Sequence, residues 1–301
     1  MADERGILHS KSNGSSHYGA THNSEPIVAS SSSQEIHIHS HSHGWRFIKH
    51  KYRKPFAEFL GTFILCVFGI GSIAQALLSG SKNGNWITIA LGFGLGLALA
   101  LVISGNVSGG HLNPAVTITL AVYRKFPWIQ VPIYIFAQTL GAFVAAAVVY
   151  VNYYAALEHY DGVAINKAGI FATYPADFMN PFGSFFSEAI GTFFLVLIIL
   201  AATDDVRNTS DSKPLAPITI GIGLLVIAIS FGYETGFALN PARDFGPRLF
   251  TFLVGYGTKV FSASKFYFWI PLVAPVFGGL TAGFVYDSLI YGGESPLNRN
   301  V

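Results

Sequence analysis

Residues 109–115 read Gly-Gly-His-Leu-Asn-Pro-Ala, and residues 236–242 read Gly-Phe-Ala-Leu-Asn-Pro-Ala. Asn followed by Pro favours a helix start, because Asn is a good N-cap and Pro suits the first helical position. The triplets Asn113-Pro114-Ala115 and Asn240-Pro241-Ala242 each head an apolar stretch too short to span a membrane. One copy indicates only a helix N-terminus, but two copies in a very apolar chain point to a pore.

The triplets belong to a longer internal repeat. Residues 57–63, Ala-Glu-Phe-Leu-Gly-Thr-Phe, recur as Ser-Glu-Ala-Ile-Gly-Thr-Phe at 187–193. The chain is therefore predicted to be a doubled unit, with one repeat at about 55–155 and the second at about 181–290.

Composition is typical of a membrane protein. Hydrophobic residues make up 51% of the chain, charged residues make up 11%, and the mean hydropathy is +0.46, whereas soluble domains carry about 25% charged residues. The net charge of +2 is too small to suggest a nucleic-acid partner. The single cysteine, Cys66, excludes an intrachain disulfide and is interpreted as a small buried hydrophobe.

Hydropathy predicts six crossings, since about 20 helical residues span the hydrocarbon core. They lie at about 55–78, 85–104, 131–154, 182–203, 215–233 and 266–286, while apolar pieces at 114–123 and 241–253 reach only halfway. Three crossings per repeat make the second repeat enter from the opposite side. The predicted fold is an all-α membrane protein with six transmembrane helices and two re-entrant half-helices, in two inverted repeats that meet near the midplane.

The chain ends are predicted to lie outside this channel region of residues 51–290. Residues 1–50 are rich in Ser, Gly, Asn and His without apolar periodicity, which predicts a disordered tail open to regulation. Residues 291–301 form a short C-terminal tail. Basic residues at 46–54 and at 124–125 predict that both termini are cytoplasmic, and we expect the membrane to be the plasma membrane. The alternating His37, His39, His41 and His43 could bind a metal ion, but no Cys or carboxylate cluster completes a site, so we expect no functional metal site and no cofactor.

Irregular backbone precedes each Asn, and at membrane depth such backbone lines a water-filled cavity or is held by protein. We expect a ladder of acceptor carbonyls from Gly109, Gly110, His111 and Leu112 and from Gly236, Phe237, Ala238 and Leu239. The asparagine amides are expected to cap their own helices and to present NH₂ donors to the lumen. Both half-helix dipoles add positive potential, which repels cations and suits neutral hydrogen-bonding solutes. His111 is interpreted either as lining the vestibule or as satisfying loop backbone.

Over about residues 55–286 these motifs resemble the aquaporin family. Residues 236–248, Gly-Phe-Ala-Leu-Asn-Pro-Ala-Arg-Asp-Phe-Gly-Pro-Arg, are similar to the glycerol-conducting branch, the aquaglyceroporins, in a fungal-type form. The resemblance implies a passive channel in the lipid bilayer for glycerol, other small neutral solutes and water, which excludes ions and protons. It also implies a homotetramer with one pore per subunit.

The resemblance further implies a constriction of four residues, namely Phe93, Ala228, Phe237 and Arg243. Ala228 stands where water-specific members carry histidine, and a methyl group there widens the ring. The two phenylalanines face the Arg243 guanidinium, so a polyol finds an apolar side and a polar side. Glycerol facilitators often carry Trp at the position of Phe93, and a channel mainly for water, ammonia or hydrogen peroxide is therefore the alternative.

Glu58 and Glu188 are ionisable groups at matching positions of two crossings. They are either a proton relay or structural supports, and the resemblance has them accept hydrogen bonds from the re-entrant loops, which a buried carboxylate needs. Asp244 is expected to be a structural support too. The crossings contain too few charged residues for an ion-coupled transporter. The sequence also contains no catalytic motif that would indicate an enzyme. A non-conducting membrane scaffold is the remaining alternative.

Overall fold

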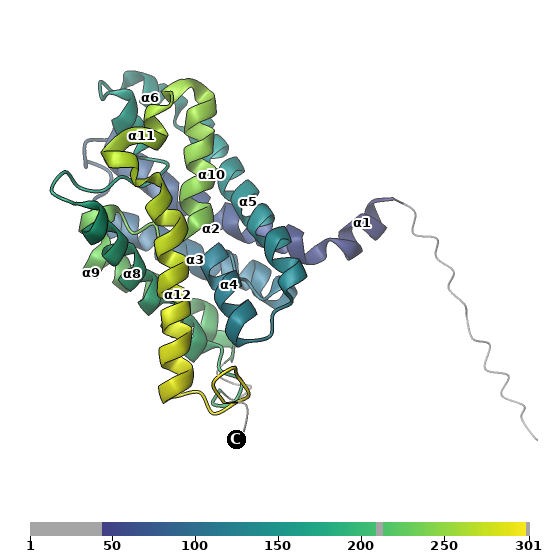
Figure 1. The fold of residues 1–301 in the computed structure, drawn as a ribbon. Coiled ribbons are helices and arrows are strands. Elements are labelled where there is room, and N and C mark those ends of the chain that lie inside the picture. Colours follow the sequence, from purple (N-terminus) through teal and green to yellow (C-terminus); the bar gives the residue numbers. More distant parts are fainter. Residues whose placement is uncertain (1–43, 209–212, 299–301) are drawn as a thin grey trace, which may run out of the picture. The chain divides into compact units, whose positions relative to one another are not determined.

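The computed structural model describes residues 44–208 and 213–298, which form helices joined by loops (Figure 1). Six of these helices are long and apolar enough to cross a membrane by length and composition. Their bounds are α2 (Arg53–Leu78), α3 (Trp86–Ser108), α5 (Val131–Asn152), α8 (Pro181–Ala202), α9 (Ala216–Thr235) and α12 (Ile270–Leu289). The predicted all-α membrane fold with six crossings is confirmed.

The two predicted half-helices are α4 (Pro114–Tyr123) and α10 (Pro241–Thr251). Each begins as its Asn-Pro pair predicts, with Asn as an extended N-cap and Pro in the first helical turn. At 10 and 11 residues, with a rise of about 1.5 Å per residue, neither crosses the hydrocarbon core alone.

The long helices pack in the same pattern in both repeats, and each half-helix packs against a long helix of the other repeat (Figure 1). Helix α2 packs against α3 and α5, as α8 packs against α9 and α12, while α3 packs on α9. Helix α4 lies against α12 of the second repeat, and α10 lies against α5 of the first. Each half-helix is therefore held mainly by the other half of the chain.

Glycines permit the closest of these contacts at matching places. A Cβ atom at Gly141 would lie 2.3 Å from the Phe59 carbonyl oxygen in the α2–α5 contact, and one at Gly278 would lie 2.1 Å from the Ala189 carbonyl oxygen in the α8–α12 contact. A Cβ at Gly246 would lie 2.5 Å from the Thr139 carbonyl, where α10 meets α5. Because helix backbones meet directly at these points, only glycine fits there.

Several boundaries differ from the predicted ones. Helix α3 continues to Ser108, beyond the predicted end at 104, and stops where Gly109 adopts a φ of 94°. The second half-helix was predicted to reach 253 but ends at Thr251, followed by a π-helical turn η3 (Phe252–Tyr256). Helix α12 begins at Ile270 and not at 266. The left-handed Phe266 ends α11 (Lys259–Phe266), and the short 3₁₀ turn η4 (Tyr267–Trp269) then leads into α12.

The remaining described elements are short connectors. They are α1 (Trp45–Lys51), α6 (Tyr154–His159), α7 (Ala164–Ala168) and the 3₁₀ turns η1 (Trp128–Gln130) and η2 (Lys213–Leu215). Residues 45–50 were predicted as part of the disordered tail but form α1. The centroid of the Trp45 ring in this helix lies 5.8 Å from that of the Phe56 ring in α2. The rest of the predicted tail, including its other histidines, lies outside the described residues.

The C-terminal segment packs against the end of the first half-helix. Arg124, which follows α4, forms two hydrogen bonds of 2.7 and 3.0 Å with the Asp287 carboxylate of α12. Its guanidinium lies 3.8 Å from the centre of the Tyr291 ring. The amide of Asn298 donates to the Tyr291 carbonyl at 2.7 Å. This C-terminal segment therefore fixes the outer end of α4 to α12.

Candidate functional site

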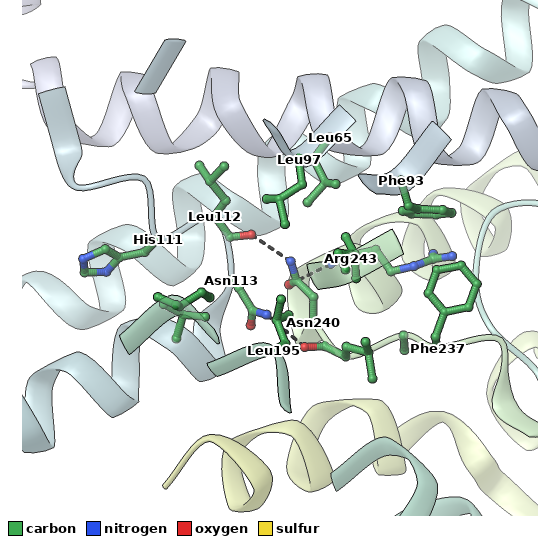
Figure 2. Close-up of a pocket in the computed structure, with 15 residues that line it drawn as sticks. Leu65, Phe93, Leu97, His111, Leu112, Asn113, Leu195, Phe237, Asn240 and Arg243 are labelled. Carbon is green, nitrogen blue, oxygen red and sulfur yellow. Dashed lines mark hydrogen bonds between the residues drawn. The ribbon is translucent and has the colours of Figure 1, made fainter. Parts of the chain in front are cut away.

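The two Asn-Pro-Ala triplets are joined by a reciprocal pair of hydrogen bonds. The Asn113 Nδ2 donates to the Leu239 carbonyl at 2.9 Å, and the Asn240 Nδ2 donates to the Leu112 carbonyl at 2.8 Å (Figure 2). Each side-chain oxygen caps its own helix, with Asn113 accepting from the Ala115 N–H and Asn240 from the Ala242 N–H. An amide NH₂ has two hydrogens, so each asparagine keeps one donor for the lumen.

The carbonyl ladder predicted from the sequence is divided by these bonds. Leu112 and Leu239 use their carbonyls to accept from the opposite asparagine. Within the described part of the chain, the other predicted carbonyls accept no hydrogen bond, namely those of Gly109, Gly110, His111, Gly236, Phe237 and Ala238. All of these residues except Gly236 line one of the two cavities.

Two buried carboxylates hold the irregular loops. Glu58 accepts from the backbone N–H groups of His111 and Leu112 at 3.0 and 2.7 Å. Glu188 accepts from those of Ala238 and Leu239 at the same two distances. Both carboxylates are fully buried, and a buried charge persists only when hydrogen bonds compensate its lost hydration. This arrangement matches a supporting role and leaves neither group aimed at a proton-transfer partner across the pore.

Further donors surround Glu58. Ser108 Oγ donates to its Oε1 at 2.6 Å, and Gln138 Nε2 donates to its Oε2 at 2.7 Å. At Glu188 the further contacts come from the Thr235 side chain and, at the longer distance of 3.4 Å, from the Tyr267 hydroxyl. The hydrogen bonds to Glu58 are all 3.0 Å or shorter, whereas one of the contacts of Glu188 is longer.

The loops contain backbone conformations that side-chain-bearing residues rarely adopt. Leu112, Phe237 and Leu239 have φ values of 52°, 43° and 53°. Such left-handed conformations cost about 1–3 kcal/mol each and persist when the surroundings determine them. Here the bonds to Glu58 and Glu188 hold the loops in these conformations, and the Leu112 and Leu239 carbonyls accept from the asparagines and not from helical N–H groups.

Three of the four predicted constriction residues lie together at one end of the cavity (Figure 2). The Phe93 and Phe237 rings meet edge to face, with centroids 5.2 Å apart at 81°. The Arg243 guanidinium lies 4.7 Å from the centre of the Phe93 ring, and its Nη1 donates to the Phe171 carbonyl at 2.9 Å. Arg243 is 2% exposed, and its Nε has no hydrogen-bond partner among the described residues. This N–H is a free donor beside two aromatic rings.

The fourth residue, Ala228, is fully buried in α9 and packs in the same apolar cluster as Phe93 and Phe237. It is not among the residues that line the narrow cavity. Its carbonyl accepts the indole Nε1–H of Trp86 at 3.0 Å. The structure thus links Ala228 to the constriction through a tryptophan that the sequence analysis did not single out.

Asp244 pairs with Arg248 and not with the adjacent Arg243. Its Oδ1 accepts from the Arg248 Nε at 2.8 Å, and its Oδ2 accepts from the Thr173 backbone N–H and hydroxyl at 2.8 and 2.6 Å. The Arg248 Nη1 donates to the Val260 carbonyl at 2.6 Å. This buried network fixes the loop that carries Phe171, whose carbonyl orients Arg243.

The cavity between the repeats is narrow. Its described lining consists of Leu65, Phe93, Leu97, His111, Leu112, Asn113, Val116, Leu195, Ile199, Leu224, Phe237, Ala238, Leu239, Asn240 and Arg243. It leaves about 30 Å³ for the centres of water molecules, and one water needs about 10–15 Å³. Figure 2 shows the asparagines between His111 at one end and Arg243 at the other. The narrow cavity therefore has room for about two or three waters.

A wider cavity of about 620 Å³ continues from the His111 end and shares His111, Leu97 and Val116 with the narrow one. Of the two roles left open for His111, the described residues show the first, because it lines both cavities. Its Nδ1 lies 3.2 Å from the Thr117 hydroxyl, a side-chain contact and not one with loop backbone. Its ring also meets those of Phe126 and Tyr134 at centroid distances of 4.6 and 5.0 Å. The ring is therefore a fixed part of the vestibule wall.

Sequence reasoning missed the partners that position these groups. They are Trp86, Ser108, Gln138, Phe171 and Thr173. None lies in a motif, and each acts on a residue distant in the chain. A Trp at the start of a crossing was the one available signal, since Trp is enriched at membrane interfaces.

Comparisons with known proteins agree with the family resemblance of the sequence. The family described as "Major intrinsic protein" matches residues 45–286. The chain is 62% identical over 310 residues to Aquaglyceroporin-2 of Rhizophagus irregularis, which covers 100% of this chain and 98% of that protein. It is 45% identical over 262 residues to the probable aquaglyceroporin-2 of Gibberella zeae, covering 84% and 77% of the two chains.

Among solved structures, the fold is similar to the X-ray structure of the aquaglyceroporin from Plasmodium falciparum. The TM-score is 0.72 at 37% sequence identity, and the match covers 79% of this chain and 96% of that one.

Proposed function

Because this chain belongs to the major intrinsic protein family and is an aquaglyceroporin channel, a multi-pass integral membrane protein and not an enzyme, we propose that it passes glycerol, other small neutral solutes and water passively. Ions and protons are excluded. The proposal rests above all on one observation, the constriction in which the Arg243 guanidinium faces the Phe93 ring beside that of Phe237.

A polyol matches both sides of this constriction. Its CH groups lie against the aromatic rings, and its hydroxyls pair with the Arg243 guanidinium and with the loop carbonyls. Each hydroxyl stripped of water and left unpaired would cost about 1–3 kcal/mol. The loop carbonyls and the two asparagine amides supply replacement partners along the cavity.

Cation exclusion follows from the charges at the centre. The buried Arg243 places a fixed positive charge in the narrow part, and the N-termini of α4 and α10 add positive partial charges where Asn113 and Asn240 meet. The carboxylates of Glu58 and Glu188 are already satisfied by loop N–H groups. A permeant cation therefore finds no counter-charge to replace its hydration.

A channel mainly for water is the second candidate. It is favoured by the limited room of about 30 Å³ in the narrow cavity, which fits a short file of waters more readily than a polyol. Stopped-flow light scattering on proteoliposomes distinguishes the two candidates. Glycerol reswelling that rises linearly with the gradient and needs no coupling ion supports the proposal, whereas water flux with no glycerol uptake above protein-free vesicles favours the second candidate.

We also propose the assembly and orientation of the channel. Four copies form a tetramer with one pore in each subunit, as the family resemblance implies. Both termini face the cytoplasm, since Arg46, Lys49 and Lys51 precede the first crossing and Arg124 and Lys125 follow α4. We further propose that the membrane is the plasma membrane. Native mass spectrometry in detergent tests the tetramer, and epitope tags at the two ends test the orientation.

A further inference from the structure

Trp86 occupies a distinctive place beside the constriction. It is the first residue of α3 and is 40% exposed. Its indole Nε1–H donates to the Ala228 carbonyl at 3.0 Å, across to α9. Its ring meets the edge of Phe237 with centroids 5.6 Å apart at 80°. One side chain therefore contacts two of the four predicted constriction residues without itself lining the narrow cavity.

Phe237 depends on such contacts for its position. Its backbone has a φ of 43°, a conformation that phenylalanine rarely adopts. Its ring has two edge-to-face partners, Phe93 and Trp86. Phe93 in turn lies under the Arg243 guanidinium. A chain of contacts therefore connects Trp86 through Phe237 and Phe93 to the arginine.

Gly232 lies directly against the rings of Trp86 and Phe237. A Cβ atom there would lie 2.4 Å from Cζ2 of Trp86 and 2.8 Å from Cδ1 of Phe237. Both rings are therefore packed directly against the backbone of α9, one turn after Ala228. Any shift of the tryptophan changes the space into which Phe237 can move, and the width of the constriction changes with it.

We propose that Trp86 is a positioning residue that sets the upper size limit of the solutes admitted, by fixing Phe237 and the Ala228 backbone relative to Arg243. This inference rests on the proposed conduction of glycerol. The indole N–H holds the α9 carbonyl, and the ring contact restricts movement of Phe237. Removing either contact widens the ring for solutes longer or broader than glycerol.

The test compares Trp86→Phe, which keeps an aromatic ring but loses the N–H, with Trp86→Leu, which loses both contacts. Trp128→Phe is the matched control, because Trp128 is exposed and lies in η1, outside the cavity lining. Proteoliposomes are assayed with water, glycerol, erythritol and xylitol. Gly232→Ala provides a second disturbance of the same packing.

The expected result is a rise in the xylitol-to-glycerol permeability ratio of about two- to tenfold, the effect of losing one neutral hydrogen bond or ring contact. This ratio rises more in Trp86→Leu than in Trp86→Phe. Gly232→Ala also changes the ratio, and Trp128→Phe leaves it unaltered. Water permeability per protein serves as the check on folding, and if Trp86→Leu does not fold, Trp86→Phe and Gly232→Ala decide. Unchanged ratios in folded variants, with wild-type glycerol flux intact, overturn the role of Trp86 alone. A wild-type protein without glycerol flux overturns the proposed function and this role together.

Discussion

The side-chain amide of Asn113 donates to the carbonyl of Leu239 at 2.9 Å, which joins the start of α4 directly to the loop that leads into α10. The reciprocal bond from Asn240 to Leu112 makes the junction symmetric. Because both asparagines also cap their own helices, the two half-helices hold each other where the two repeats meet. The positive ends of their dipoles meet there.

This junction predicts a cost for changing the amide to a carboxylate. Asn113→Asp keeps the acceptor for the Ala115 N–H but turns an oxygen toward the Leu239 carbonyl. We expect a loss of about 1–3 kcal/mol in stability, the cost of an unsatisfied buried polar group. Thermal unfolding in detergent measures it, with Asn166→Asp, on an exposed residue of α7, as the control. Equal unfolding temperatures for the two variants would contradict the junction.

The two loop-holding carboxylates are predicted to differ in their contribution to stability. Replacing Glu58 by Gln turns an NH₂ group toward existing donors, either Leu112 and Gln138 or Ser108 and His111. Glu188→Gln disturbs fewer short bonds. We therefore expect both variants to unfold at lower temperature, with Glu58→Gln the less stable, by about 1–3 kcal/mol per unsatisfied donor.

The exposed Glu158 provides the matched control for that series. Glu158→Gln should unfold like the wild type. If Glu188→Gln proves the less stable of the two buried variants, the count of hydrogen bonds does not govern how these loops are held.

Arg243 is predicted to be the main barrier to cations. Arg243→Val removes the fixed charge over the Phe93 ring and the bond to the Phe171 carbonyl. We expect a proton or cation leak and a weaker preference for polyols. A pH-sensitive dye inside proteoliposomes reports the leak, and stopped-flow scattering reports the preference. A tight variant with unaltered solute preference would show that the barrier lies elsewhere.

The segment before the channel is predicted to be dispensable for the pore. The described residues that line the narrow cavity run from Leu65 to Arg243, and all the groups that hold them lie after residue 57. Deletion of residues 1–43 should leave folding, oligomeric state and the glycerol-to-water ratio unchanged, while any regulation by this serine-rich segment alters only the amplitude of flux. A shifted ratio after the deletion would assign this segment to the pore itself.

Much of the architecture was predictable because it depends on local signals. Asn-Pro at 113–114 and 240–241 marked both half-helix starts, and runs of apolar residues marked the six crossings. Helix ends were less predictable. The break at Phe266 depends on a left-handed residue that the apolar pattern of the sixth crossing does not reveal. The helix at residues 45–50 was also not predicted, because its neighbours in the sequence are polar.

The site was predictable only where a motif or a family resemblance marked it. Phe93, Phe237 and Arg243 lie together as the resemblance implied. The pairing of Asp244 with Arg248 and Thr173 was not foreseen, because Thr173 lies in a connecting loop without a periodic pattern. Contacts of this kind depend on tertiary packing, which one sequence does not encode in any short window.

The most direct test of the central claim is the glycerol-to-water permeability ratio of the wild type and of Ala228→His in matched proteoliposomes. Ala228 is fully buried in the same apolar cluster as Phe93 and Phe237, so we expect an imidazole there to take space from the constriction. The expected result is high glycerol flux in the wild type and a fall in the variant that is much larger for glycerol than for water. Glycerol and water permeabilities that fall in equal proportion would contradict this account of the constriction.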